Sequence, residues 1–498
     1  MDGDWINNAY RVLPYKYIKL ELVILPLVFG ILSFFIPVKW VRVSTLIFAF
    51  SSLIVGMTRL LLFDPKYMEY LFHSGKVYKL GLTFEMGYDG IGIVMLALSN
   101  LVIFLVALAN FNKEEANAPR FAGLIFLMQF GLNGLFAAQD AVMFYIFWEF
   151  TLIPVFLMLY WFGAKENNRT LLKFFLYTLF GSLFMLLSIL AIGVYSNSYA
   201  YETIQYTAIP AKYACWIFSG FLIAFAVKVP LFPFHTWQPN TYSTAPMAGT
   251  MLLSAIMLKM ALFGMIKWMI PLSFSALPTW QWPVIILSVI GILYGAFIAM
   301  REYNIRKVFA FASISHLGLI VAGIMVFTVD SLQGSIIQMV NHSLIAIGLF
   351  FAAGIIEQRL GTSNLNEMGG IAKIAPRFGF WFGVIMFVSL SVPMTAGFIG
   401  EFLLIKSVFE FNSWMGILSA LTLVIGAVYM IRAYQMSSMG APKITAFKDL
   451  MWNEISVFAI IAILALSLGL YPDFIFSIVK PSIKHMLEAV ADTQLIIK

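Results

Sequence analysis

Fourteen runs of mostly apolar residues follow one another along this chain, and short connections between them hold most of its charges. A helix needs about twenty such residues to cross a hydrocarbon core of roughly 30 Å. The runs therefore predict an all-α polytopic membrane protein of about fourteen transmembrane helices. Their centres lie near residues 28, 52, 100, 128, 152, 183, 224, 257, 290, 317, 344, 391, 424 and 462.

Composition supports a chain that is surrounded by a lipid bilayer. Of its 498 residues, 61% are hydrophobic and only 11% are charged, and the mean hydropathy is +0.91. Soluble domains carry roughly a quarter charged residues. The net charge of +7 does not indicate nucleic acid as a partner, because the basic residues are spread over the connections.

The residues that usually bind metals and cofactors are scarce. Cys215 is the single cysteine, which excludes a disulfide framework and a cysteine-ligated cluster within the chain. The five histidines are scattered, and no glycine-rich phosphate loop or paired-cysteine motif is present. We expect no metal site and no bound cofactor in this chain.

The distribution of basic residues predicts the orientation. The first nineteen residues hold no cleavable signal pattern, so the first helix is expected to remain as a span. Sixteen lysines and arginines fall in or beside the odd-numbered connections. By the positive-inside rule both termini then face outward. The outer connections are assigned only five basic residues: Lys66, Lys76, Lys79, Lys212 and Lys267.

Two of the spans contain helix-breaking residues. The seventh reads VKVPLFPFHTWQP and the twelfth reads SVPMTAGFIGEF, about 163 positions later. Proline removes a backbone donor, and broken backbone persists in a membrane only where protein or a water-filled cavity satisfies it. Within a single membrane domain, 1–498, we predict two inverted repeats with discontinuous helices 7 and 12. The first covers residues 119–270 (helices 4–8) and the second 280–435 (helices 9–13).

Two charges lie in the fifth and seventh spans. Glu149, in AVMFYIFWEFTLIP, is some eight residues inside its span, where an ionised group costs about 2.5 kcal/mol or more and is functional by default. Lys228 directly precedes the first break. A carboxylate helps a buried amine to keep its proton, so separating a Glu–Lys pair releases one. The structural alternatives are an ion pair that joins helices and a lysine that extends to the membrane surface.

Two further charges lie in the eighth and twelfth spans. Lys259, in MLLSAIMLKMALFG, has apolar neighbours on both sides and is interpreted as a central proton carrier. Glu401, in GFIGEFLLIK, follows the second break and would end a path that Lys259 begins. The alternative for Glu401 is solvation at a helix end, because Lys406 and Glu410 follow soon after.

Three histidines are candidate relays. His316 and His342 lie in consecutive apolar spans, and His235 lies at the first break. Histidine has two ring nitrogens and titrates near neutral pH, which suits proton transfer. A structural role as a hydrogen-bonded core residue remains an equal alternative for each of them.

Six motifs in order resemble those of the proton-translocating antiporter-like family: FYIFWEFTLIPVFL, KFFLYTLFGSL, AFAVKVPLFPFHTWQP, APMAGTMLLSAIMLKMALFG, SISHLGL and GFIGEFLLIKS. That family includes the L, M and N subunits of bacterial complex I and Mrp-type cation/proton antiporters. The resemblance covers nearly the whole chain. It implies a Glu–Lys pair at Glu149 and Lys228, a central lysine at Lys259 and a terminal ionisable group at Glu401.

The chain resembles the M-type chains of bacterial respiratory complex I (NADH:quinone oxidoreductase) in two respects: it has glutamate at position 401, and its length is similar. The resemblance implies proton translocation in a multi-pass protein of the bacterial inner membrane, driven by quinone reduction in partner subunits. It implies L-type and N-type chains as neighbours. NADH, FMN, iron–sulfur clusters and quinone would belong to partner subunits, so the chain would be part of an enzyme without a redox step of its own.

One loop departs from the family pattern, and other functions stay open. The chain reads HTWQPNTYSTAP where members commonly read HTWLPDAHTEAP, which weakens the case that this loop takes part in proton uptake. The alternatives are a Mrp-type Na⁺/H⁺ antiporter subunit and a membrane subunit of a hydrogenase or formate hydrogenlyase-like complex. A third is a scaffold whose charges only hold helices together.

Overall fold

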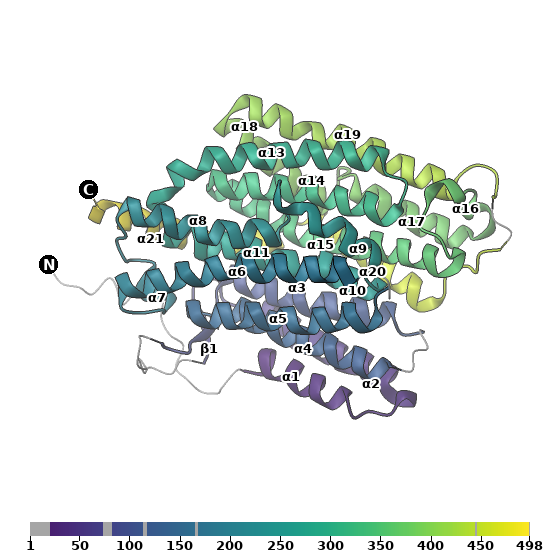
Figure 1. Cartoon of the computed structure of the whole chain (residues 1–498), viewed down its shortest axis with the longest axis horizontal. Helices are drawn as coiled ribbons and strands as arrows, with labels where there is room; N and C mark the ends of the chain where they lie inside the picture. Colours follow the sequence, from purple (N-terminus) through teal and green to yellow (C-terminus); the bar gives the residue numbers. More distant parts are fainter. Residues whose placement is uncertain (1–19, 73–81, 113–116, 165–167, 444–445, 498) are drawn as a thin grey trace.

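A computed structural model of the chain describes residues 20–72, 82–112, 117–164, 168–443 and 446–497. Its long helices run side by side along the long axis of the molecule (Figure 1). In the described part, twelve helical segments are long and apolar enough to cross a bilayer. With the short first helix and the broken twelfth span they account for the fourteen predicted spans, which confirms the all-α polytopic fold.

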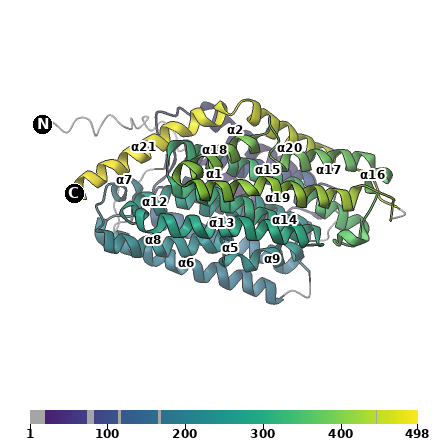
Figure 2. The same ribbon diagram turned by 90° about the horizontal axis from the view of Figure 1, so that it is seen from above.

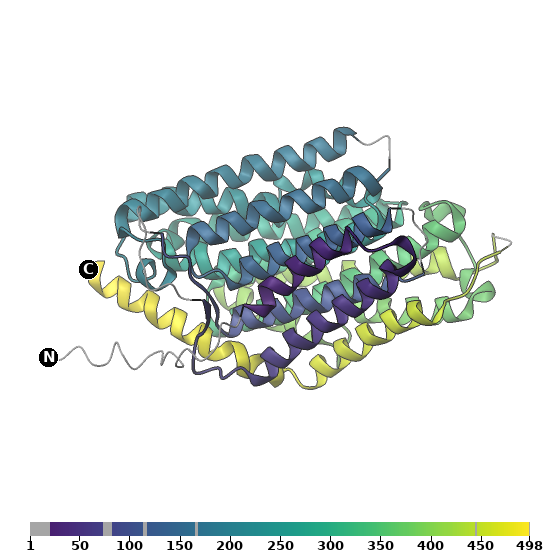
Figure 3. The same ribbon diagram turned by 90° about the horizontal axis from the view of Figure 1, so that it is seen from below.

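The first part of the chain forms one face of the bundle, drawn in front in Figure 3. A small antiparallel β-sheet connects the second and third helices. The elements are α1 (Glu21–Ser33), α2 (Val38–Leu62), β1 (Glu69–Phe72), β2 (Met86–Tyr88), α3 (Gly90–Ala109), α4 (Ala118–Ala137) and α5 (Ala141–Phe162).

The next helix, α6 (Asn168–Ser196), lies along one edge of the bundle, opposite α20 and α21 (Figure 2). Its exposed face is apolar and repeats every three or four residues, which is the helical period. A stripe of this kind is unstable against water, so this face of α6 is suited to contact lipid or another apolar surface. The exposed residues are Leu172, Leu176, Phe180, Leu183, Leu187, Leu190 and Val194.

The first break lies where the sequence predicted it. α8 (Ala211–Lys228) ends directly before the prolines, and η3 (Phe234–Trp237) and α9 (Gln238–Thr244) continue the chain. The indole N–H of Trp237 donates to the carbonyl of Val227 at 2.8 Å. This bond satisfies a backbone group beside the break, as a low-dielectric environment requires. The short helix α7 (Tyr201–Ile204) precedes α8 and lies at the other end of the bundle from α9 (Figure 1).

The eighth span runs from Met247 to Leu272 and is completely buried within the bundle. Two π-helical segments interrupt it, and such segments often mark functional positions. The span consists of α10 (Met247–Leu252), η4 (Leu253–Met257), α11 (Leu258–Gly264), η5 (Met265–Met269) and α12 (Ile270–Leu272).

The second half begins with three long helices, of which the second and third are almost entirely buried. The 3-10 turn η6 (Phe274–Ala276) leads into α13 (Leu277–Arg301), which is followed by α14 (Ile305–Val326) and α15 (Val329–Leu360). The guanidinium of Arg306 donates to the carbonyl of Ala245 at 2.8 Å, which ties the end of α9 to the start of α14.

The second break separates α17 (Pro376–Ser389) from α18 (Ala396–Phe411). Ser391 and Met394 adopt left-handed conformations there, with φ of 51° and 79°. Both discontinuous helices are therefore present, whereas the repeat boundaries 119–270 and 280–435 stay predictions. The remaining elements are η7 (Leu365–Glu367), α16 (Ile371–Ile374), α19 (Ser413–Ser438), α20 (Trp452–Leu470) and α21 (Asp473–Ile497).

The bundle has two ends, which we call the α7 end and the α16 end after the short helices that lie there (Figures 1 and 2). The connection after α13 lies at the α16 end, because Leu365 of η7 donates to the carbonyl of Tyr303 at 2.8 Å. Arg301 and Arg306 flank this connection. Basic residues assigned by sequence to the inner side thus lie at the α16 end.

Candidate functional site

The centre of the bundle contains Lys259, whose side chain is fully buried. Lys259 is in α11, between the two π-helical segments. Its Nζ donates to the carbonyl of Ser254 at 2.9 Å and lies 2.8 Å from Nδ1 of His342 on α15. Two residues predicted separately, 83 positions apart in the chain, are therefore in direct contact.

The contacts continue from His342 to a second histidine. The ring of His316, on α14, lies with its centre 6.2 Å from the centre of the His342 ring. Both rings line a narrow cavity of about 10 Å³. That is about the smallest space that holds one water molecule. One water therefore suffices to connect the two imidazoles.

Glu401 lies at the other end of this row, one turn into α18. Its Oε1 is 3.0 Å from Nδ1 of His316, a distance suited to an ion pair when the ring is protonated, although the ring is not aligned for a hydrogen bond. The amide of Gln338, on α15, donates to the same oxygen at 3.1 Å. Lys259, His342, His316 and Glu401 thus form one buried row of ionisable groups, called here the central row.

Close helix packing at Glu401 depends on Gly400. A Cβ at this position would lie 2.5 Å from Oε1 of Gln338. Only glycine lets α18 approach α15 closely enough for Gln338 to reach the carboxylate.

Glu401 is not solvated in the way that its neighbours in the sequence suggested. Lys406, one turn further along α18, pairs instead with Asp330 at 2.8 Å and is well exposed. Glu401 itself is only 2% exposed. The alternative that it is solvated at a helix end is therefore wrong.

Glu149 and Lys228 lie on neighbouring helices but are not in contact. Within the described residues, no ion pair within 4.0 Å joins them. Lys228 is buried, and its Nζ lies 5.6 Å from the ring centre of Trp148 on α5. One carboxylate oxygen of Glu149, Oε1, is buried without a hydrogen-bond partner in the described part of the chain. The structure therefore shows the two predicted residues without a direct contact between their charged groups.

His235 lies apart from the central row. Its ring stacks on Phe232, with centres 5.6 Å apart, and meets the ring of Tyr294 edge-on at 4.8 Å. The structure places the ring in an aromatic environment beside the first break. A relay role for His235 stays a prediction.

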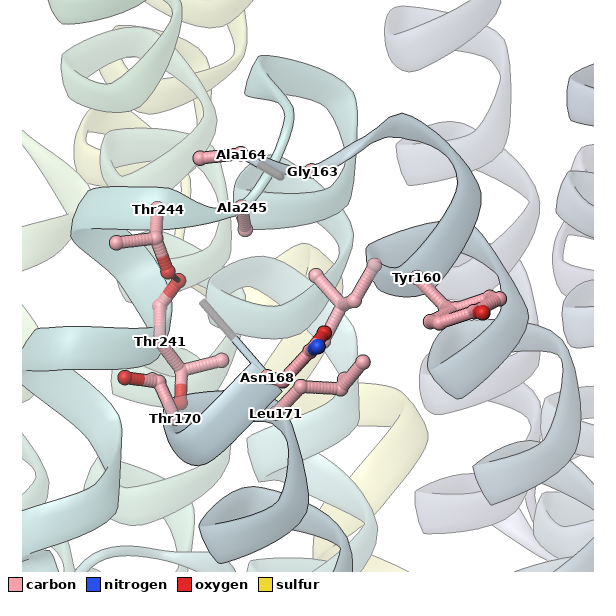
Figure 4. A pocket seen from close by; sticks show the side chains of 10 residues that line it. Tyr160, Gly163, Ala164, Asn168, Thr170, Leu171, Thr241, Thr244 and Ala245 are labelled. Atoms are coloured by element: carbon pink, nitrogen blue, oxygen red, sulfur yellow. Dashed lines mark hydrogen bonds between the residues drawn. The ribbon is translucent and has the colours of Figure 1, made fainter. Parts of the chain in front are cut away.

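A cavity of about 260 Å³ opens beside the loop that departs from the family pattern (Figure 4). It lies between the end of α5, the start of α6 and α9. Thr241 and Thr244 line it from α9, and Asn168 and Thr170 from α6. The amide of Ala164 donates to the carbonyl of Thr244 across its edge. Among the described residues that line it, none carries a charge at neutral pH, and Tyr160 is the one titratable side chain. This agrees with the neutral character of the loop.

The assignment of Lys267 to an outer connection is wrong. Lys267 lies in η5, inside the eighth span, and its side chain is 3% exposed. It donates to Oδ2 of Asp89 at 2.8 Å. The signal was present in the sequence, because apolar residues continue on both sides of Lys267 as far as Leu272. Asp89 gave no comparable signal, since it stands between a strand and a helix.

Metal chemistry receives no support from the described residues. No group of three or more histidine, cysteine, aspartate or glutamate side chains is arranged to hold an ion in the ranges that the structure covers.

Comparisons with known proteins agree with the resemblance seen in the motifs. A family model described as "NADH:quinone oxidoreductase/Mrp antiporter, TM" matches residues 138–426. A protein of Rickettsia conorii named NADH-quinone oxidoreductase subunit M is 32% identical over 461 residues, which cover 91% of this chain and 92% of that protein.

Two solved structures resemble the fold over nearly the whole chain. A chain of respiratory complex I from Thermus thermophilus matches with a TM-score of 0.86 and 28% identity, covering 96% of this chain and 99% of that one. A chain of the Mrp complex from Dietzia sp. matches with a TM-score of 0.84 and 18% identity, covering 97% of this chain and 56% of that one. At that identity the second likeness concerns the fold alone.

Proposed function

The chain belongs to the NADH:quinone oxidoreductase/Mrp antiporter transmembrane family, and we propose that it is the M-type proton-translocating subunit of a respiratory NADH:quinone oxidoreductase. The observation that carries this proposal is the central row. Four ionisable side chains in an otherwise apolar interior are costly to bury, and in membrane proteins such residues mark ion and proton pathways.

The central row supplies the steps of a proton transfer. Protonated Lys259 gives a proton to Nδ1 of His342, 2.8 Å away, and becomes a neutral amine. The imidazole releases a proton from its other ring nitrogen to a water that would occupy the small cavity lined by both rings. His316 takes up this proton and, after its ring turns to align Nδ1–H with the carboxylate 3.0 Å away, passes it to Glu401. Gln338 holds that carboxylate in position.

Glu149 and Lys228 act as the switch in this proposal. When they are in contact, the carboxylate stabilises the ammonium and Lys228 keeps its proton. In the separated arrangement, burial favours the neutral amine, and a proton becomes free to move towards Lys259. The break after Lys228 is where a change of distance would take place in this proposal, because the regular helix hydrogen bonds end there and α9 begins ten residues later.

The α16 end faces the cytoplasm and the α7 end faces outward in this proposal. Arginines and lysines of the connections at the α16 end support this orientation through the positive-inside rule. The chain is then a multi-pass protein of a bacterial inner membrane, with protons taken up at the α16 end.

Redox chemistry belongs to partner subunits. The electron donor NADH, FMN, iron–sulfur clusters and quinone would be bound there, and this chain would contribute proton translocation to the whole enzyme. L-type and N-type antiporter-like chains are the proposed neighbours in the membrane. Large apolar side chains such as Trp216, Phe380 and Trp414 are exposed, and they form apolar surface that lipid and such neighbours can cover.

A Mrp-type Na⁺/H⁺ antiporter subunit is the second candidate, because the fold is similar. Glu401 argues against it, since the family usually has lysine at this position in the Mrp-type D chain. A hydrogenase or formate hydrogenlyase-like membrane subunit is a third candidate that shares the motifs.

Affinity purification through a tag on this chain distinguishes the candidates. We expect a complex that contains iron–sulfur subunits and reduces quinone with NADH. A complex without iron–sulfur proteins would point to the antiporter, and one that oxidises formate or evolves hydrogen but does not oxidise NADH would point to the third candidate. Either result would contradict the proposal.

A further inference from the structure

A cavity of about 390 Å³ with a mixed polar and apolar lining opens at the α7 end. Its walls come from the start of α3, from α7 and the residues that follow it, from η5 and from α21. The titratable groups that line it are Asp89, Tyr201, Glu202, Tyr206, Lys267 and His485. The cavity is large enough for several waters, since one water occupies about 30 Å³ of the liquid.

The ion pair of Lys267 and Asp89 forms the inner wall of this cavity. An ammonium carries three donors. One reaches Oδ2 of Asp89, and Nζ also lies 4.7 Å from the ring centre of Tyr201. Asp89 is held in turn, because its other oxygen accepts the amide of Gly92 at 2.8 Å and caps α3. A buried lysine therefore stands at the boundary between the bundle interior and a space that water can fill.

Lys267 and Lys259 lie on the same buried span, eight residues apart. At 1.5 Å per residue this is about 12 Å along the helix axis. Apolar side chains such as Phe263 fill the interval, so the two lysines are not connected in this arrangement. Lys267 itself lies within η5, where the hydrogen bonds of the helix are irregular and a shift of the backbone is least costly.

Two pairs of an acidic residue and a buried lysine differ in their arrangement. Asp89 and Lys267 are in contact at 2.8 Å, whereas no ion pair within 4.0 Å joins Glu149 and Lys228 in the described residues. A closed pair keeps its lysine protonated and an open pair releases the proton. Lys259 lies between Lys228 and Lys267 in the chain. Two such pairs would let a proton enter at one and leave at the other without an open path between them.

We propose that Asp89 and Lys267 form a second switchable pair, through which protons pass between Lys259 and the cavity at the α7 end. When the pair separates, an N–H bond of the Lys267 ammonium breaks, and the proton joins a water of the cavity as hydronium. The neutral amine regains a proton from the side of Lys259. This inference rests on the proposed function, and it adds a second branch at Lys259, beside the central row that ends at Glu401, by which a proton reaches the α7 surface.

The test uses Lys267→Arg and Lys267→Met in the assembled complex. Arginine keeps the ion pair with Asp89 but does not give up its proton in proteins. If Lys267 passes protons, both variants lower the rate of NADH-driven proton uptake in inverted vesicles to the level of Glu149→Gln. If the pair is only structural, Lys267→Arg retains the uptake of the parent complex, and the inference is overturned.

Two controls separate this inference from the proposed function. Lys212→Met removes an exposed lysine elsewhere at the same end and should leave proton uptake unchanged. Glu149→Gln reports on the proposed function itself. Loss of uptake in Glu149→Gln together with normal uptake in Lys267→Arg would overturn only the second pair.

A cysteine variant keeps the inference testable if the Lys267 variants fail to assemble. Thr203 lines the cavity and is exposed, and Cys215 is the single native cysteine. Cells with Thr203→Cys in a Cys215→Ala background are treated with an impermeant cationic thiosulfonate, and inverted vesicles are then prepared. We expect labelling from outside and a lower rate of NADH-driven proton uptake than in the untreated variant. Complete labelling with unchanged uptake would contradict the inference.

Discussion

The side-chain nitrogen of Lys259 lies 2.8 Å from Nδ1 of His342, deep inside the bundle and between two helices that are distant in sequence. Neither group has another ionisable neighbour as close as this one in the described part of the chain. The contact begins the row that ends at Glu401, and it makes the role of His342 directly testable.

Replacement of His342 by alanine should interrupt the central row. The gap left by the ring separates Lys259 from His316, and the loss of a positioned proton carrier typically costs about 100-fold or more in rate. We expect NADH-driven proton uptake in inverted vesicles to fall by roughly that factor. Met339→Leu, one turn earlier on α15, conserves volume and serves as the control. Uptake that matches the control would show that His342 is only structural.

Gly400→Ala should disturb Glu401 without touching its carboxylate. The added Cβ would overlap Oε1 of Gln338, so Gln338 must move away from Glu401. Overpacking of this kind usually costs about 1–3 kcal/mol in stability. We expect a lower unfolding temperature of the purified complex and slower proton uptake.

Gly426→Ala is the matched control for that substitution. A Cβ at Gly426, on α19, would find its nearest atom 3.6 Å away, which is ordinary contact. If both alanine variants lower the unfolding temperature and proton uptake equally, the close approach of α18 to α15 does not determine the position of Glu401.

Glu149→Gln, Lys228→Met and the double variant test whether these residues act as a unit. Removal of either partner abolishes the switch, so the double variant should lose no more proton uptake than the more affected single variant. Residues that act together are strongly non-additive. The scaffold interpretation predicts instead that the neutral double variant recovers the rates of the parent, and that recovery would contradict the switch.

The ion pair at the α7 end predicts a pH dependence of stability. Burial raises the pKa of Asp89, but the Lys267 ammonium and the amides of Gly92 and Ile91 lower it by more, so the pKa lies below its ordinary value of 3.8. A lowered pKa stabilises the fold above the unfolded pKa, and this contribution is lost as the pH falls through the folded pKa.

Asp89→Asn should therefore destabilise the complex most at neutral pH. The difference in unfolding temperature between parent and variant should persist down to about pH 4 and shrink below it, where Asp89 of the parent is protonated as well. A difference that is constant over this range would show that Asp89 acts through its shape rather than its charge.

Much of the fold and of the site can be predicted from the sequence, because lipid imposes length and composition on each span. The runs of apolar residues give the helices, and the prolines give both breaks. A charge inside such a run is expensive, so Glu149, Lys228, Lys259 and Glu401 can be selected without a structure. Their proposed roles stay predictions.

The contacts between these residues could not be predicted. A buried helix such as α15 is apolar all round, and its sequence does not tell which face meets which neighbour. The contact of Lys259 with His342 depends on that choice. Lys267 was missed for a related reason, since a lysine near the end of an apolar run resembles a helix end. The distance between Glu149 and Lys228 could not be predicted either. The sequence places these two residues in the fifth and seventh spans but does not say whether their charged groups are in contact.

The central claim is that buried ionisable groups of this chain carry protons in step with quinone reduction, and Lys259 is its most direct test. The measurement records NADH-driven quinone reduction and dye-reported proton uptake together in inverted vesicles that carry Lys259→Met, after the complex is shown to assemble. Met257→Leu, in the same span, is the control. We predict that both activities fall by roughly 100-fold, while NADH oxidation by an artificial acceptor remains. Normal quinone reduction and proton uptake from an assembled Lys259→Met complex would contradict the account.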